Sequence, residues 1–328
     1  WSTMTCFLFK LTFDTAVHFG GSDSALSLYT SEETLRADTL FSALCHEALN
    51  QHGENALQKL CDDVQQGRLL FSDLMPWCGK TLYLPKPILP SESTEEVETT
   101  LRKKVKKLAW IPVLRFDEYA RSLHAGHFDP DKKDAPEVRT SFGSHFEQTK
   151  AAIQGDTEPY QVGLFRFAPD CGLYFICSCA DARQADTLAT LLDGLGMTGI
   201  GGKVSAGYGK FHTAGKTLLH VPVDEQTKWL YRALMADHAA GQLLLTTSLP
   251  QDEELDTALE DASFQLVRRG GYMASDRVNA ALKKKTQYFL SAGSVLRHRY
   301  QGALYDVSLT AAHPVYRYSK PLFMGVDL

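Results

Sequence analysis

The sequence predicts an α+β protein of two domains, the first of them a ferredoxin-like sheet with insertions. Before residue 221, segments that alternate apolar and polar residues are interleaved with segments of helical spacing. Their order is strand, helix, strands, helix, glycine-rich loop, strand, which is the order of a βαββαβ unit. A second series of predicted elements follows, so we expect domains at residues 1–221 and 222–328, sizes that suit a chain of 328 residues.

The first predicted elements are a strand, a helix and two more strands. Residues 6–13 alternate apolar residues with Thr, Lys and Asp, as a half-buried strand does. Residues 39–51 carry apolar side chains on one helical face, and Asp38 stands where an N-cap is expected. Residues 69–71 and 81–84 are short apolar runs that predict two further strands.

The rest of the first domain contains a long insertion and then returns to regular elements. Residues from about 114 to 160 show no sustained periodicity, and a long irregular stretch inside a compact domain is usually a functional loop or hairpin. Residues 164–167 and 173–179 restore the alternation of strands. Residues 181–195 predict a helix, and Gly196 is placed to end it.

The final strand of the first domain and the elements of the second complete the prediction. A strand begins at Phe211, after the glycine-rich segment. In the second domain we expect a helix over residues 225–237, a strand over residues 242–248 and a strand-rich region from Tyr288 onward.

The charges of the chain are segregated along the sequence. A net charge of −5 does not by itself favour nucleic acid as a partner. Basic residues nevertheless crowd residues 102–107, 203–216 and 268–285, whereas acidic residues crowd residues 92–98 and 252–261. Such segregation permits a basic RNA track on one face and an acidic surface elsewhere. The simpler alternative is that each charged run is solvated.

The cysteines and the hydropathy indicate a reducing, aqueous compartment. The chain has seven cysteines, at positions Cys6, Cys45, Cys61, Cys78, Cys171, Cys177 and Cys179. An odd number scattered through apolar segments predicts reduced thiols and a cytoplasmic location. The absence of a Cys-x-x-Cys pair argues against a zinc site, and we expect neither metal nor cofactor. No run approaches the ~20 apolar residues of a membrane span, and the first residues do not resemble a signal peptide.

The glycine-rich segment at residues 196–210 is the strongest functional signal. Dense glycines allow positive φ and close backbone approach, and they can present amide N–H groups to anions. Lysines add charge, a serine adds a hydroxyl and a tyrosine adds a stacking face, which together suit an RNA backbone. A mobile surface loop is the alternative. The candidate RNA-contacting residues here are Gly199, Gly201, Gly202, Lys203, Ser205, Gly207, Tyr208, Gly209 and Lys210.

Two familiar glycine-rich motifs do not fit this segment. In a nucleotide P-loop ending at Lys203, the first glycine would fall on Met197, and Val204 replaces the Ser or Thr that binds magnesium. A dinucleotide-binding loop follows a strand and precedes a helix, whereas this loop follows a predicted helix and precedes a predicted strand.

The pattern G-x-G-G-K-x-S-x-G-x-G between a helix and a strand resembles the RAMP superfamily of repeat-associated CRISPR proteins. Residues 31–44, 103–112 and 288–318 are similar to segments of the fourth subunit of type III-A (Csm) effector complexes. The resemblance spans nearly the whole chain.

This resemblance implies a non-catalytic, RNA-binding subunit of an antiviral CRISPR complex. It implies two ferredoxin-like (RRM-like) domains and a role in holding the 5′ repeat-derived tag of the guide RNA (crRNA). It also implies docking onto the large polymerase-palm subunit and onto a backbone RAMP subunit. The irregular residues 124–160 resemble the insertion that forms a thumb-like hairpin against RNA in this superfamily. In that insertion, Arg139 and Thr140 are candidates for phosphate contact and Tyr160 for base stacking.

The start of the first predicted helix offers a second candidate contact. Free N–H groups and the positive end of the helix dipole favour a phosphate there, with Arg36, Thr39 and Ser42 nearby. The alternative is that Asp38 is simply an N-cap and the neighbouring apolar residues are core.

A RAMP endoribonuclease that processes repeat RNA without a metal is the main functional alternative. His18, at the end of the first strand, is the histidine that would act as an acid or base, and otherwise it is a candidate RNA contact. His124, His127 and His145 lie in the irregular stretch and His46 on a helix. A lone histidine is more often structural, so no catalytic residue is assigned. A binding module unrelated to CRISPR is a third possibility.

Overall fold

The structure is a computed structural model. It describes residues 4–21, 27–90, 99–150, 159–271, 283–309 and 314–327. The α-helices are α1 (Ala37–His52), α2 (Glu54–Gln65), α3 (Thr99–Lys107), α4 (Phe116–Ser122), α5 (Ala182–Thr198), α6 (Glu225–Met235) and α7 (Leu255–Leu259). Short 3-10 turns are η1 (Val113–Arg115), η2 (Val204–Ala206) and η3 (Asp252–Glu254).

The strands of the first part are β1 (Thr5–Phe13), β2 (Leu69–Phe71), β3 (Met75–Cys78), β4 (Thr81–Pro85), β5 (Trp110–Pro112), β6 (Gly143–Lys150), β7 (Tyr160–Phe167), β8 (Cys171–Cys179) and β9 (Phe211–Leu218). Those of the second part are β10 (Gly241–Leu244), β11 (Leu266–Arg269), β12 (Gln287–Leu290), β13 (Val295–Leu296), β14 (Ala303–Asp306), β15 (Tyr316–Ser319) and β16 (Phe323–Val326).

A seven-stranded antiparallel sheet forms the centre of the molecule. Its order is β5-β4-β3-β8-β1-β9, and β2 also pairs with β8. Thus β1 lies between β8 and β9, while β2 and β3 lie on the far side of β8, as the predicted βαββαβ order requires. The mixed composition of helices and antiparallel sheets confirms the α+β class. The strands β6 and β7 pair as a separate hairpin.

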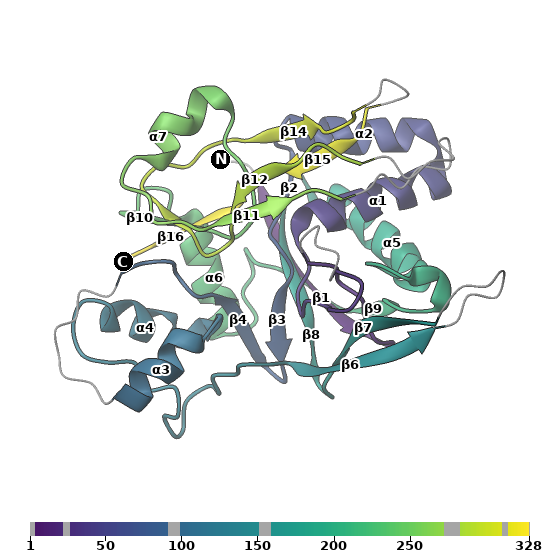
Figure 1. Ribbon diagram of the computed structural model, residues 1–328. Coiled ribbons are helices and arrows are strands. Elements are labelled where there is room, and N and C mark those ends of the chain that lie inside the picture. The colour runs from purple at the N-terminus through teal and green to yellow at the C-terminus, as the bar shows by residue number, and fades with distance from the viewer. Residues whose placement is uncertain are drawn as a thin grey trace.

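Helices cover one face of this sheet because their apolar residues recur at helical spacing. Leu40, Leu44 and Ala48 of α1 are buried in a cluster that also holds Leu188 and Leu192 of α5. The same cluster includes β1 and β8 side chains, where the Phe9 and Phe175 rings stack with centroids 5.3 Å apart. Figure 1 shows α1, α2 and α5 gathered on this side of the sheet.

Helix α6 and strands β10 and β16 of the C-terminal part pack against the opposite face. In β1, Phe7, Phe9 and Leu11 belong to the helix-side cluster, whereas Cys6 and Leu8 belong to a second cluster. This alternation follows the period of two in a strand. The second cluster continues through Ile176 of β8 to side chains of α6, β10 and β16, namely Leu230, Leu243 and Met324. The two parts therefore share a continuous core, and the division near residue 221 stays a prediction.

The C-terminal part consists of short sheets around β10. The strand order β13-β10-β16 makes a three-stranded sheet, and β11-β12 and β14-β15 form two-stranded ribbons. Side chains tie this part of the chain to the first part: the Tyr318 hydroxyl of β15 accepts from the Phe71 N–H at 2.7 Å, and the Thr246 hydroxyl, after β10, donates to the Phe71 carbonyl at 2.7 Å.

Two predicted helix ends are wrong. Helix α1 starts at Ala37 with no side-chain cap, because the Ala37 N–H donates to the Asp73 carboxylate at 2.9 Å from another segment. Helix α5 does not stop at Gly196 but continues to Thr198, and Gly199 follows it with φ +100°. Gly196 serves packing instead, since a Cβ there would lie 2.3 Å from the Phe211 carbonyl oxygen.

The expectation that all cysteines are reduced is also wrong. Cys78 at the end of β3 and Cys171 at the start of β8 face each other in the strand register and form a disulfide. These residues are 93 positions apart in the sequence. Only the pairing of β3 with β8 brings them together, and no spacing rule would have found it.

The stretch expected to be irregular contains regular elements. It holds α4 and β6 and ends where β7 begins, while residues 151–158 lie outside the described part of the chain. The sequence signal was weak because β6 is mostly exposed on both faces and so lacks apolar alternation.

Candidate nucleic-acid interface

The glycine-rich loop adopts left-handed backbone conformations at several positions. Positive φ occurs at Gly199, Gly201, Gly207 and Gly209, and Lys203 also has φ +60°. Lys203 precedes the 3-10 turn η2 and Gly207 follows it. The glycines therefore allow a tightly folded loop that other residues would strain.

The loop is held against the segment that follows β1. The Gly202 N–H donates to the His18 carbonyl at 2.8 Å, and the Gly209 N–H donates to the Ala16 carbonyl at 2.9 Å. The Lys210 N–H donates to the Thr15 hydroxyl at 3.0 Å. These amides have acceptors within the protein, so in this structure they are not available to an anion. The amides of Gly202, Gly209 and Lys210 therefore serve to fix the loop to the end of β1.

Close backbone packing explains the glycine at Gly209 and Gly201, and also at Gly199, where a Cβ would lie 2.6 Å from the Tyr208 carbonyl oxygen. A Cβ on Gly209 would lie 2.1 Å from the Ile200 carbonyl oxygen, and one on Gly201 would lie 2.8 Å from the His18 carbonyl oxygen. Gly207 differs, because a Cβ there would meet nothing within 4 Å. The glycine density thus reflects how the loop folds upon itself and upon the β1 end.

We expect Gly209→Ala to lower the free energy of unfolding by about 1–3 kcal/mol more than Gly207→Ala does. Both substitutions place a side chain at positive φ, but only at Gly209 does the new Cβ collide with backbone. Urea unfolding of the two variants measures the difference. Equal stabilities would show that the contact between Gly209 and Ile200 does not constrain the loop.

The β6-β7 hairpin meets the loop through two pairs of lysine and tyrosine. The Lys203 Nζ lies 4.9 Å from the centre of the Tyr160 ring, and the Lys150 Nζ lies 4.9 Å from that of Tyr208. The Tyr208 hydroxyl also hydrogen-bonds Gln148. We call the side chains of Lys150, Tyr160, Lys203, Tyr208 and Lys210 the loop–hairpin surface. The structure therefore brings Tyr160 to the loop and adds Lys150, which the sequence reasoning missed.

His18 lies beneath this surface. Its side chain is 7% exposed, and its Nδ1 is 2.7 Å from the Gly163 carbonyl oxygen in β7. A Cβ on Gly202 would come within 2.6 Å of the imidazole Cδ2. His18 thus lies between the loop and the hairpin and ties both to the end of β1.

The candidate residues at the start of α1 have other partners. The Asp38 carboxylate accepts two hydrogen bonds from Arg269 of β11, each 2.8 Å long, and Arg269 also donates to the Thr39 hydroxyl at 3.2 Å. Burial alone would raise the pKa of Asp38, but the guanidinium of Arg269, with those of Arg36 and Arg317, outweighs it, and the pKa is lowered. Ser42 lies half-buried in the next turn of the helix.

Arg36 lies on the wall of a cavity between the two parts of the chain. The cavity has a volume of about 980 Å³, and its lining includes Lys86 and Trp110 from the first part and Phe264 from the second. Arg36 is thus placed among different residues from those of the loop–hairpin surface.

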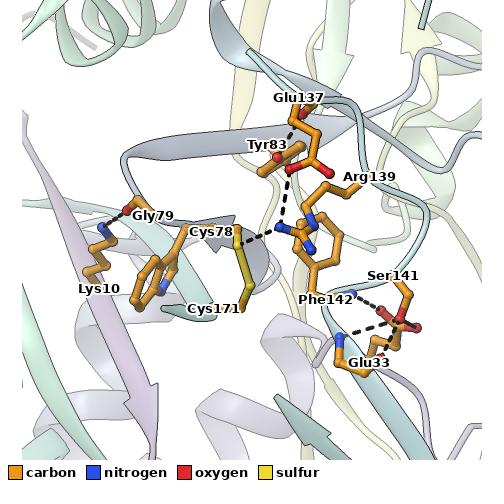
Figure 2. Close-up of a disulfide and its surroundings, with 12 residues drawn as sticks. Lys10, Glu33, Cys78, Gly79, Tyr83, Glu137, Arg139, Ser141, Phe142 and Cys171 are labelled. Atoms are coloured by element: carbon orange, nitrogen blue, oxygen red, sulfur yellow. Dashed lines mark hydrogen bonds and ion pairs between the residues drawn. A yellow bond between two sulfur atoms is a disulfide. The ribbon is translucent and has the colours of Figure 1, made fainter. Parts of the chain in front are cut away.

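Arg139 and Thr140 also lie away from the glycine loop. The Arg139 guanidinium is 3.1 Å from the Cys78 sulfur and 3.3 Å from the Glu137 carboxylate, as Figure 2 shows. Thr140 is exposed in the segment that leads into β6. The predicted set of RNA contacts therefore falls into three groups, of which the loop–hairpin surface is the one that joins loop and insertion.

Membrane-spanning helices and clusters of metal ligands are both absent from the part of the chain that the structure describes. None of the helices placed by the structure is both long and apolar enough to span a bilayer. Nor do three or more His, Cys, Asp or Glu side chains converge as metal ligands in the ranges that the structure covers.

Comparison with known proteins gives a consistent result along the whole chain. The RAMP superfamily model matches residues 10–212, and the model of the CRISPR Csm4 C-terminal domain matches residues 237–326. The CRISPR system Cms protein Csm4 of Mycobacterium tuberculosis (strain H37Rv) is 34% identical over 327 residues, which cover 97% of each chain.

Solved structures share the fold. One match is to a crystal structure of a Csm3-Csm4 subcomplex in the type III-A CRISPR-Cas interference complex, with 16% identity and a TM-score of 0.66 over 99% of this chain and 100% of that one. Another is to a Csm1-Csm4 cassette in complex with pppApA, with 20% identity and a TM-score of 0.60 over 99% and 98%. From the RAMP match over the sheet and loop, the C-terminal match and the full-length relative, the chain belongs to the Csm4 family of the RAMP superfamily.

Proposed function

We propose that this chain is the subunit of a type III-A CRISPR complex that binds the 5′ repeat-derived tag of the crRNA through the loop–hairpin surface. The observation that carries the proposal is the convergence of two lysine–tyrosine pairs from segments far apart in the sequence. Aromatic rings stack on unpaired bases and lysines neutralise phosphates, which is how single-stranded RNA is held without reading every base.

The fold and the relatives support a place inside a larger assembly. Solved structures whose titles name Csm1-Csm4 and Csm3-Csm4 complexes share this fold. We infer docking of this chain onto the large polymerase-palm subunit on one side and onto a backbone RAMP subunit on the other. Both parts of the chain are inferred to be ferredoxin-like, the first on its strand order. A CRISPR complex acts on nucleic acid inside the cell, so the inferred location is the cytoplasm.

The surroundings of His18 argue against a catalytic role for this histidine. An acid or base for RNA cleavage must reach the reacting oxygen atoms. The imidazole of His18 is nearly buried, and one of its nitrogens is engaged by the Gly163 carbonyl. The chain is therefore proposed to hold RNA without cutting it.

A single experiment separates the tag-binding subunit from a processing nuclease. End-labelled repeat RNA is incubated with the purified protein, without metal, and divided between a native gel and a denaturing gel. We expect retention of RNA that carries the 5′ tag, weaker retention of a scrambled RNA of equal length, and no cut in either. A discrete cut that disappears in His18→Ala would make the chain a nuclease, and equal retention of both RNAs would contradict tag recognition.

A further inference from the structure

The disulfide joins two turns at one end of the central sheet. Cys78 closes β3 and Cys171 opens β8, and next to them the Gly79 N–H donates to the Asp170 carbonyl at 2.6 Å. The two Cα atoms are 4.1 Å apart because the residues face each other in antiparallel strands. The sheet would hold both sulfur atoms within reach of each other whether or not they are bonded.

The two sulfur atoms have different surroundings. Cys171 is 2% exposed and packs in a cluster with Tyr83 and Phe142, whose rings meet edge to face at 4.8 Å. Cys78 is only half-buried, and the Arg139 guanidinium lies 3.1 Å from its sulfur. Figure 2 shows Arg139 reaching the Cys78 side of the bond. Both cysteines contact this cluster, but Cys78 is only partly buried and lies next to a cation, whereas Cys171 is buried within the cluster.

This asymmetry matches the requirements of a sensing thiol and a resolving thiol. An adjacent cation favours the thiolate, which is the form that reacts with oxidants. Sensor cysteines are accessible and lie next to a second cysteine that closes the disulfide. The fully buried pair Cys177 and Cys179 does not have these features, although its sulfur atoms are 3.0 Å apart.

We propose that Cys78 and Cys171 form a reversible redox site for hydroperoxides, with Cys78 as the reacting thiol and Cys171 as the resolving thiol. The Cys78 thiolate attacks one oxygen of hydrogen peroxide, the O–O bond breaks, and with one proton the products are the sulfenic acid and water. The Cys171 thiol then attacks the sulfenic sulfur, which forms the disulfide and releases a second water. Two equivalents of a low-molecular-weight thiol reverse the reaction by exchange, giving both cysteines as thiols and one external disulfide.

A reversible bond also fits the compartment inferred for this chain. Disulfides in a reducing cytoplasm are typically transient or redox-sensing rather than permanent. The inference goes beyond RNA binding and can be tested without RNA.

The site would also change the electrostatic partner of Arg139. In the reduced protein the guanidinium faces a thiolate, whereas in the oxidised protein it faces a neutral disulfide and the Glu137 carboxylate. This segment is fixed on either side of Arg139: the Tyr83 hydroxyl donates to the Glu137 carbonyl at 2.8 Å, and the Phe142 N–H donates to the Glu33 carboxylate at 3.2 Å. Oxidation would therefore leave Glu137 as the anionic partner of Arg139.

The test starts from fully reduced, full-length protein treated with hydrogen peroxide at neutral pH. Peptide mapping under non-reducing conditions should find Cys78 linked to Cys171, and a small thiol should restore both thiols. In Cys171→Ser the sulfenic acid should persist at Cys78 and be captured by dimedone. Failure of the reduced wild-type protein to form this bond, or dimedone labelling of Cys78 no greater than that of Cys45, would overturn the proposal.

The role of Arg139 is tested by the rate at which Cys78 reacts with hydrogen peroxide. Arg139→Gln should slow the reaction of Cys78 with peroxide on the order of tenfold at pH 7, because the thiolate fraction falls when the cation is removed. Arg183→Gln removes an equal charge from an exposed site on α5 and should leave the rate unchanged. Equal rates in both variants would exclude Arg139 as the activating group.

Discussion

Arg269→Met is expected to lower the free energy of unfolding by about 3–5 kcal/mol, because it leaves the Asp38 carboxylate buried without its partner. The Asp38 side chain is 7% exposed and that of Arg269 is 13% exposed. Two hydrogen bonds of 2.8 Å join them, and they fasten β11 to the first turn of α1. Urea unfolding at neutral pH measures the loss.

The double variant Asp38→Leu, Arg269→Met is the control for this result. It removes both charges, so most of the lost stability should return. Lys228→Met on the exposed surface of α6 should change stability little. If the double variant is as unstable as Arg269→Met alone, packing rather than the unpaired charge is responsible.

The ion pair of Asp38 and Arg269 also makes the stability of the fold depend on pH. Because the folded-state pKa of Asp38 lies below its ordinary value, the carboxylate stabilises the fold above the unfolded-state pKa near 4. That contribution is lost as the pH falls from about 4 through the lower folded-state pKa. In the double variant this part of the acid sensitivity should be absent, which unfolding curves between about pH 4 and pH 2 would reveal.

The second large effect is expected on the affinity of the protein for the tag RNA. Lys203→Glu combined with Lys210→Glu is expected to weaken binding of the tag RNA on the order of 100-fold at ~0.1 M salt. Lys203 lies over Tyr160, so reversing its charge also disturbs a ring proposed to stack on a base. If each lysine neutralises one phosphate, the slope of log affinity against log salt should fall in magnitude by about 1.4. Fluorescence anisotropy over a salt series measures both quantities.

A matched variant separates local contact from overall charge. Lys133→Glu with Lys228→Glu changes the net charge equally at exposed positions on other elements. It should alter affinity only slightly and leave the salt slope nearly unchanged. Equal losses in both double variants would mean that the loop lysines act through net charge and not as phosphate contacts.

The sequence predicted the elements whose residues follow a strong period. Strand β1 and helix α1 were placed within two residues of their observed bounds, because each buries a regular face. The errors occur where a distant segment decides the outcome. Asp73 rather than Asp38 satisfies the first amide of α1, and contact with Phe211 rather than a helix end explains Gly196.

The candidate site, like the fold, could be predicted where the local sequence pattern is strong and not where a distant segment decides the contact. The glycine pattern located the loop, but it could not show that the amides of Gly202, Gly209 and Lys210 bond to residues that follow β1. Lys150 was missed because β6 lacks the apolar alternation that would have marked it as a strand beside the loop. The sequence makes Arg139 a candidate phosphate contact, whereas the structure places it against Cys78, 61 positions away in the sequence.

The core shared by the two parts limits how the two parts of the chain can be recombined in evolution. The face of the central sheet that bears Leu8 and Ile176 is covered by side chains such as Leu230 and Met324 from the other end of the chain. Interiors are packed closely enough that a change of one methylene is felt by its neighbours. A recombination that joined the first part of this chain to the second part of a distant relative would bring together surfaces shaped for different partners. The two parts are therefore expected to pass between genomes together. The residues on the two sides of their contact are expected to change in a correlated way.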